Sequence, residues 1–209
     1  FVQVTLPFSF DFYGQSETSV KISSNGYLTF GNDGRDFSND SIPNAIDPDA
    51  IIAPFWDDLN PVRGGDVYYY SDRVNDRFIV EYDGLQPYSG TGNYTFQAIL
   101  NGDGSIEFQY NSMTGQLASA TVGIENHAGD AGVQVAYNNG YVQSGLAVSI
   151  TEASDTPTHN TVIVSSGLDV TGADFGNHNP NGGVNHNPTG AVTISGTATE
   201  DQTLTAAST

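Results

Sequence analysis

The sequence predicts an all-β protein, an antiparallel β-sandwich with loops rich in Gly, Asn and Asp. Two observations lead to this fold class. Short segments rich in Val, Ile, Thr, Tyr and Phe recur along the chain between Gly, Asn and Asp residues, and no window shows sustained helical periodicity. Within the clearest segments apolar and polar residues alternate, which is the pattern of a sheet with one buried and one solvated face.

Three pairs of strands are expected from the turn signals. Residues 20–30 form a hairpin in which Asn25 and Gly26 supply a type I′ turn. Residues 67–71 pair with 78–82, and residues 94–100 pair with 106–110. Further strands are expected at residues 120–124, 133–137 and 146–150.

The stretch from Ala50 to Leu59 runs from an unbroken apolar segment into the single Trp and then into two adjacent carboxylates. Its length and its flanking Asp and Pro residues favour a buried strand over a helix. Because Pro54 has no N–H to donate to a ladder, this strand is expected at a sheet edge or at a bulge. Trp56 is expected in the core.

The domain organisation follows from shifts in composition. Residues 1–151 are expected to form the sandwich, and residues 152–176 two short strands that complete it or are appended to it. Residues 177–190 repeat Asn-His-Asn-Pro without apolar periodicity and are expected to be a linker. Residues 191–209 begin a following repeat module, so we expect the chain to be a segment of a longer protein.

Charge is strongly asymmetric: 24 acidic residues face 5 basic ones, a formal net charge of −19, and no Lys or Arg follows Arg77. This argues against nucleic-acid binding and against docking on an anionic membrane surface. No apolar run is long enough to span a bilayer. The acidic surface points either to bound divalent cations or to adaptation to saline water, and both remain open.

Carboxylates at the two ends of the apolar strand are candidate calcium ligands. Asp47 and Asp49 precede the strand, and Asp57 and Asp58 follow it. A six-residue strand spans roughly 20 Å, so two separate rim sites are expected rather than one. The alternative is structural: the first pair are turn residues, and one of the second pair binds backbone amides.

A second candidate site is the polar loop after the first hairpin. It contains Asp33 and Asp36, which are candidate metal ligands, and Asp40, a candidate ligand-binding residue.

Three consecutive tyrosines, Tyr68, Tyr69 and Tyr70, occupy one predicted strand and cannot all face the core. Either Tyr69 or the pair Tyr68 and Tyr70 is expected to be exposed. Exposed tyrosine is a common anchor for peptides and sugars, so Tyr68 and Tyr70 are candidate binding residues. The alternative is an ordinary cross-strand aromatic pair.

Catalysis finds little support in the sequence. The four His residues are spread over loops and linker, and neither Gly-x-Ser-x-Gly nor His-Glu-x-x-His is present. A carboxylate pair assembled in space for glycoside hydrolysis stays open. We therefore expect a protein without enzymatic activity.

Six segments, in this order, resemble the nidogen-like β-sandwich domain of extracellular and bacterial surface proteins: LPFSFDFYG (6–14), ISSNGYLTFG (22–31), IAPFWDD (52–58), NYTFQ (93–97), DGSIEFQY (103–110) and VGI (122–124). Residues 194–205, ISGTATEDQTLT, resemble the opening of repeat modules in bacterial RTX-type adhesins. Residues 171–177, TGADFGN, are similar to the closing strand of small surface-protein modules.

These resemblances imply a secreted or cell-surface adhesin segment that is stabilised by Ca²⁺. Its expected partners are a peptide or glycan on a host or neighbouring cell, and the adjacent repeat domains of the same chain. Two alternatives stand beside a binding module: an architectural spacer, and an accessory domain of a secreted hydrolase. The spacer hypothesis predicts that residues 68–70 are buried or paired.

Overall fold

The computed structural model describes residues 1–31, 34–152, 192–195 and 205–208. The chain divides into two compact units, Phe1–Glu152 and Ala153–Thr209. In the second unit, β12 (Val192–Ser195) pairs antiparallel with β13 (Thr205–Ser208). The strands expected within 152–176 and the linker expected at 177–190 lie outside the described residues.

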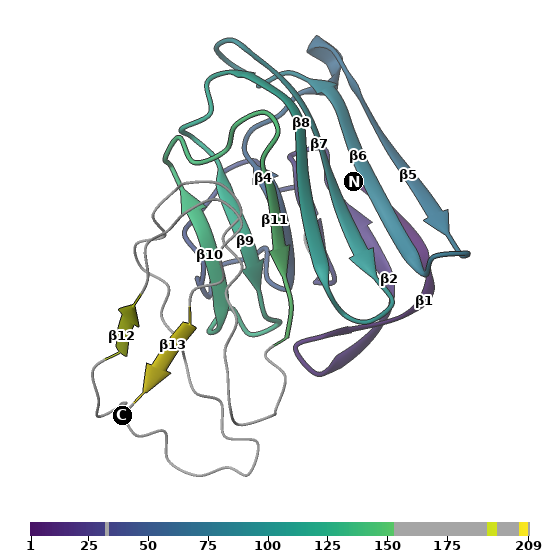
Figure 1. Ribbon diagram of the computed structural model, residues 1–209. Coiled ribbons are helices and arrows are strands. Elements are labelled where there is room, and N and C mark those ends of the chain that lie inside the picture. Colours follow the sequence, from purple (N-terminus) through teal and green to yellow (C-terminus); the bar gives the residue numbers. More distant parts are fainter. Residues whose placement is uncertain (32–33, 153–191, 196–204, 209) are drawn as a thin grey trace. The chain divides into compact units, whose positions relative to one another are not determined.

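The first unit consists of two antiparallel sheets, which confirms the predicted all-β sandwich (Figure 1). The six-stranded sheet has the order β1-β2-β3-β4-β9-β10. Its strands are β1 (Val2–Phe12), β2 (Gln15–Ile22), β3 (Leu28–Thr29), β4 (Ile51–Trp56), β9 (Thr121–Glu125) and β10 (Gly132–Tyr137).

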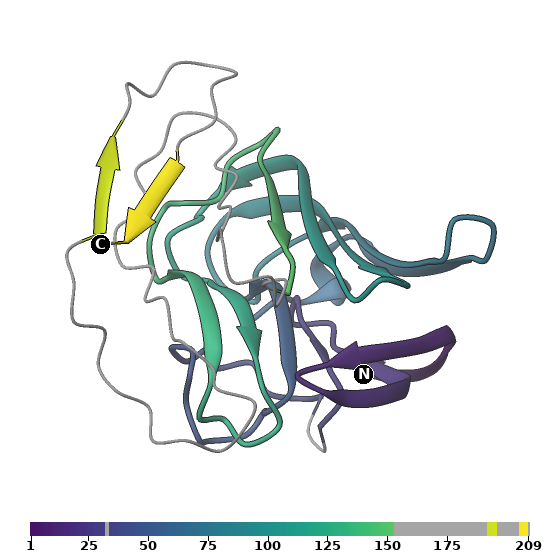
Figure 2. The ribbon, with the colours of Figure 1, turned by 60° about the horizontal axis from the view of Figure 1, so that its bottom comes forward.

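The five-stranded sheet has the order β11-β8-β7-β6-β5. Its strands are β5 (Asp66–Asp72), β6 (Arg77–Leu85), β7 (Gly92–Asn101), β8 (Ile106–Gly115) and β11 (Ala147–Ile150). Figure 2 shows the purple β1–β2 pair in one layer and the blue-to-teal strands β5 to β8 in the other. In the described part of the chain the single helical element is η1 (Pro61–Arg63), and no helix is long and apolar enough to cross a membrane.

The predicted strand pairs are confirmed, but the type I′ turn is wrong. β2 ends at Ile22 and β3 begins at Leu28, so the connection is a five-residue loop rather than a two-residue turn. Gly26 has a φ of +77°, whereas Asn25 does not have a positive φ. The loop is wider because Asn25 makes long-range hydrogen bonds: its carbonyl accepts from Asp57 N at 3.1 Å, and its Oδ1 accepts from Leu59 N at 3.2 Å.

The apolar strand β4 lies in the interior of the six-stranded sheet, between β3 and β9. All of its residues are buried, because one face packs on the other sheet and the other face is covered by Tyr27 and Ile42. Of the two positions expected for Pro54, the bulge is the one observed. The register with β9 shifts between Ala53 and Trp56, and Phe55 N donates to Gly26 O instead of continuing the ladder.

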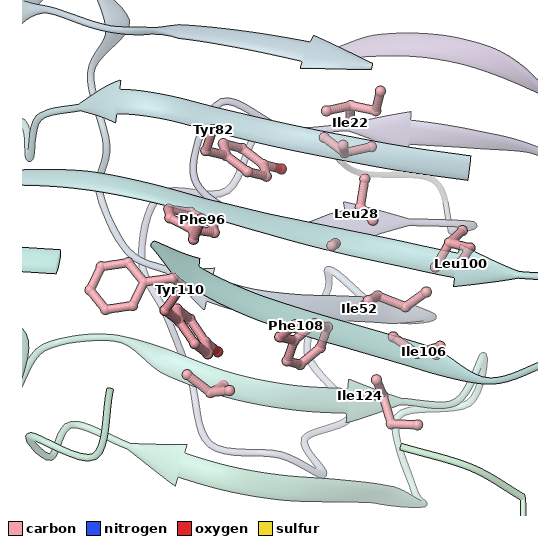
Figure 3. Close-up of a cluster of buried hydrophobic side chains, with 14 of the residues drawn as sticks. Ile22, Leu28, Ile52, Tyr82, Phe96, Leu100, Ile106, Phe108, Tyr110 and Ile124 are labelled. Carbon is pink, nitrogen blue, oxygen red and sulfur yellow. The ribbon is translucent and has the colours of Figure 1, made fainter. Parts of the chain in front are cut away.

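The core lies between the sheets and is rich in aromatic side chains (Figure 3). Two buried tyrosines tie the layers together by hydrogen bonds. Tyr110 Oη donates to Pro54 O at 2.7 Å, and Tyr82 Oη lies 3.0 Å from Ser23 O. Trp56 is buried as expected, in a second cluster with Tyr27, whose ring centroid is 5.3 Å away.

Candidate ligand-binding surface

The outer face of the five-stranded sheet carries a row of mainly polar side chains that begins at an exposed tyrosine. Strand pairing aligns this row directly across all five strands, so its side chains leave the sheet on the same side. The opposite side of these strands holds the buried Val80, Phe96 and Phe108. The row consists of Tyr68, Glu81, Gln97, Gln109 and Ala147.

A second row lies beside the first, one pleat further along each strand. It consists of Tyr70, Ile79, Ile99, Glu107 and Ser149. Beyond this row, Arg77 Nη2 forms an ion pair with Asp72 Oδ2 at 2.7 Å. In Figure 1 the five-stranded sheet lies in front of the other, with this face toward the viewer.

All three tyrosines of β5 are exposed, by 54% for Tyr68, 52% for Tyr69 and 64% for Tyr70. The expectation that one side of the strand would be covered is therefore wrong. Tyr69 points to the inner side, where its ring centroid lies 5.9 Å from that of Phe78. It stays exposed because β5 is the edge strand and no further strand of its sheet covers it.

Hydrogen bonds hold the polar side chains of this face in place. Gln97 Nε2 donates to Glu81 Oε2 at 3.2 Å, and Gln109 Nε2 donates to Glu107 Oε2 at 3.3 Å. Tyr68 Oη donates to Asp66 Oδ2 at 3.3 Å, and the negative charge of Asp66 raises the pKa of this phenol. The tyrosine is therefore a neutral hydrogen-bonding group at physiological pH.

A hollow of about 410 Å³ opens on the same face, beside the first row. Two β-bulges border it: the register shifts between Tyr82 and Leu85 on β6, and Asn111 is the extra residue of β8. Bulges bend and twist the strands that contain them, and this curvature makes the outer face of the sheet concave at the hollow. The polar side chains that line the hollow are Glu81, Thr95, Gln97, Gln109 and Asn111, and residues 145–147 close one side of it.

Asp57 and Asp58 lie directly after β4, at the rim of the six-stranded sheet. Asp57 Oδ1 accepts from Asp58 N at 2.8 Å, and Asp57 Oδ2 accepts from Ser119 Oγ at 2.6 Å. The first bond agrees with the structural alternative, in which one of these two aspartates binds a backbone amide. Burial, and then the charge of Asp57, raise the pKa of Asp58. The Asp58 carboxylate makes no hydrogen bond to another described residue.

Asp47 and Asp49 lie at the opposite end of β4, near the buried Glu125 at the end of β9. Burial, and then the charge of Asp47, raise the pKa of Asp49, whose Oδ1 is buried without a hydrogen-bond partner among the described residues. Glu125 Oε2 accepts from Asn44 N at 2.6 Å. Burial raises the pKa of the Glu125 carboxyl to about 7. The hydrogen bond from Asn44 N acts in the opposite direction and lowers this pKa, and the negative charges of Asp49 and Asp40 raise it by smaller amounts.

The loop after the first hairpin contributes structural contacts. Asp36 Oδ1 accepts from Ser38 N at 2.8 Å, and Asp40 O accepts from Thr121 Oγ1 at 2.6 Å. Asp33 lies outside the described residues. Within residues 1–31 and 34–152, no three His, Asp or Glu side chains gather as a metal-binding group.

The structure thus brings Tyr68 and Tyr70 together on one face, and it leaves the predicted acidic residues that it describes apart, at the two ends of β4 and in the loop after the first hairpin. Sequence reasoning missed Glu81, Gln97 and Gln109 as their neighbours. Gln109 is one of the polar residues that alternate with apolar ones in residues 106–110, a pattern that indicates an outward side chain, but only the pairing register shows that it shares a row with Tyr68.

Fold and surface together define a two-sheet β-sandwich module with exposed tyrosines and polar side chains on the outer face of its five-stranded sheet. Residues 2–165 match a protein-family model described as NIDO related, and the chain belongs to this family. The match covers all of the first unit except Phe1, and it bears out the nidogen-like resemblance of the sequence. No solved structure matches the chain. Membership of this family is compatible with an extracellular, non-catalytic module.

Proposed function

We propose that this chain is an extracellular ligand-binding module, without catalytic activity, of a large RTX-type bacterial surface adhesin. It binds a peptide or glycan on another surface through the outer face of the five-stranded sheet. The nidogen-related family supports the extracellular module, and the adhesin-like residues 194–205 support its context.

The observation that carries this proposal is the exposure of Tyr68 and Tyr70 beside a hollow lined by fixed polar groups. Binding surfaces commonly combine large aromatic contact areas with a few oriented hydrogen-bonding groups. A spacer without a ligand predicts residues 68–70 to be buried or paired. Tyr69 contacts Phe78, but Tyr68 and Tyr70 are exposed and have no aromatic partner among the described residues, which favours a binding role for these two.

Binding is tested with the full chain on panels of immobilised glycans and of peptides. A bound ligand whose affinity falls on substitution of Tyr70→Ala supports the proposal. The proposal is contradicted if neither panel yields a ligand, because a module of this class must recognise something on the opposing surface.

We further propose that Ca²⁺ stabilises the module at the rim around Asp57 and Asp58. The net charge of −19 supports this proposal, because a bound cation relieves repulsion between carboxylates. Asp57 already supports the backbone after β4, so its removal would destabilise the fold with or without an ion. The better test is the substitution Asp58→Asn.

The melting temperature of the wild type is expected to fall on addition of EDTA and to recover with excess Ca²⁺. In Asp58→Asn the response to Ca²⁺ should be weaker. An unchanged melting temperature in EDTA would exclude a stabilising role for calcium, and an unchanged response in Asp58→Asn would exclude this rim as its place.

A further inference from the structure

We infer that the ligand of the outer sheet face is an uncharged glycan that lies across the strands, from Tyr68 on β5 to Gln109 on β8. This inference rests on the proposed function and names the class of ligand and the subsite. It follows from three features of the face: its dimensions, the chemistry of its side chains and its charge.

The dimensions suit an elongated ligand rather than a single small molecule. Tyr68 and Gln109 are three inter-strand steps apart, which corresponds to roughly 14 Å. The hollow lies at the Gln109 end of the row, where the small side chain of Ala147 follows on β11. A chain of several sugar units would extend from the tyrosines into this hollow.

The side chains suit sugar hydroxyls. Hydrogen bonds within the face use one Nε2 proton of Gln97 and one of Gln109. Each amide therefore retains its second proton and its carbonyl oxygen, and Glu81 retains a carboxylate oxygen, so the row offers both donors and acceptors to hydroxyl groups. The faces of Tyr68 and Tyr70 provide the apolar contact area against which the C–H face of a sugar ring packs.

The charge of the face selects against acidic glycans. The two rows contain Glu81 and Glu107 and no Lys, Arg or His, and Asp66 and Asp83 border them on the tyrosine side. The nearby Arg77 is paired with Asp72. Within the two rows an anionic sugar would therefore meet like charges without a basic partner, which disfavours its binding. Arg73 lies outside the rows, in the turn between β5 and β6.

A peptide would recognise a different part of the same region. An extended peptide that adds a strand pairs with backbone groups along the free edge of β5, and its affinity would not depend on the side chains of Gln97 and Gln109. A basic peptide attracted by the acidic surface would also lose affinity steeply as salt rises. These differences separate the two classes of ligand.

The test uses one array that carries uncharged oligosaccharides of glucose, mannose, galactose and N-acetylglucosamine, acidic glycans with uronate, sulfate or sialic acid groups, and a peptide library. The full chain is applied at low and at high NaCl. Binding to uncharged oligosaccharides, with an affinity that changes less than about twofold with salt, is the expected result.

Four variants locate the site, and circular dichroism checks their folding. Tyr68→Ala and Gln109→Ala should each lower the affinity about tenfold or more, as expected for the aromatic and amide side chains that anchor the two ends of the bound ligand. Tyr69→Ala is the matched control for the first, because Tyr69 is equally exposed on the same strand but faces the other side. Gln3→Ala, on β1 of the other sheet, is the control for the second. Neither control should change the affinity more than about twofold.

The possible outcomes separate this inference from the proposed function. Selective binding of peptides that is lost in Tyr68→Ala would overturn the glycan and leave the binding module standing. A preference for acidic glycans would overturn the argument from charge, and glycan binding that survives both Tyr68→Ala and Gln109→Ala would overturn the subsite. The absence of any ligand on the array would overturn both the inference and the proposed function.

Discussion

Tyr68 and Glu81 lie directly opposite each other on β5 and β6, with both side chains on the outer face of the sheet. The same register continues to Gln97 on β7 and Gln109 on β8. An exposed aromatic ring is thereby placed at the end of a row of hydrogen-bonding groups, on a rigid meander of paired strands. This alignment is the basis of the binding surface, and the predictions below separate its role from that of the core that supports it.

The double variant Tyr68→Ala, Tyr70→Ala should keep its stability while it loses binding. Both side chains are exposed on an edge strand, so each substitution should lower the free energy of unfolding by less than about 1 kcal/mol. Urea unfolding measures this, and the double variant is then applied to the same panels as the wild type. A large loss of stability would mean that these tyrosines support the fold rather than contact a ligand.

Removal of the Tyr110 hydroxyl should weaken the contact between the two sheets. Tyr110→Phe leaves the side chain packed but removes its hydrogen bond to Pro54 O, which should cost about 1 kcal/mol. Thermal or urea unfolding gives the difference. Tyr137→Phe, at a far more exposed position, is the matched control and should change stability little. Equal effects of the two substitutions would show that the hydrogen bond between the sheets contributes nothing.

Gly26→Ala should destabilise the fold much more than Gly14→Ala. Both glycines have similar positive φ values, +77° and +75°, so both variants carry the same backbone strain of about 1 kcal/mol. At Gly26 an added Cβ would also lie 1.9 Å from Phe55 O, whereas at Gly14 nothing lies within 4 Å. The difference between the two variants should therefore exceed about 2 kcal/mol, measured by urea unfolding. Similar losses in both would contradict the close approach of this loop to β4.

Glu125 should make stability depend on pH. Its pKa is raised from 4.5 to about 7 in the folded state, so the folded protein binds this proton more tightly than the unfolded chain does. The contribution is fully favourable below pH 4.5, decreases as pH rises toward 7 and is absent above that. Over this pH range the contribution of Glu125 to the free energy of unfolding falls by about 3 kcal/mol.

The variant Glu125→Gln has no such proton and should lack this part of the pH dependence. The difference in free energy of unfolding between the variant and the wild type, measured from pH 4.5 to 8, isolates the effect of this residue from those of other carboxylates. It should move in favour of the variant as pH rises. A difference that does not change with pH would show that Glu125 is ionised normally in the folded protein.

Sequence patterns predicted most strands of the first unit because those strands have local signatures, whereas β1 was not expected from its pattern. The strand pair predicted at residues 94–100 and 106–110 is β7 and β8, and the unbroken apolar run at β4 indicated a buried strand, both faces of which the structure shows to be covered. The position of β4 between β3 and β9 was not predictable, since it depends on contacts with residues far away in the chain. The turn at Asn25 was wrong for the same reason: distant partners at Asp57 and Leu59 determine the loop.

The candidate site was predictable only in part. The tyrosine run was visible in the sequence, but its full exposure follows from the edge position of β5, which no local pattern reveals. The acidic residues stood out by composition, yet Asp57 makes structural hydrogen bonds. Glu125 belongs to no motif, but among the described carboxyl groups its pKa is raised the furthest, to about 7.

Heteronuclear NMR of the ¹⁵N-labelled chain, titrated with the uncharged oligosaccharide that binds most tightly on the array, tests the central claim most directly. The outer sheet face should show the largest amide shift changes, at the outward residues of β5 to β8 that include Tyr68, Glu81, Gln97 and Gln109. Shift changes that concentrate instead at the rim after β4, around Asp57 and Asp58, would contradict the assignment of ligand binding to this face.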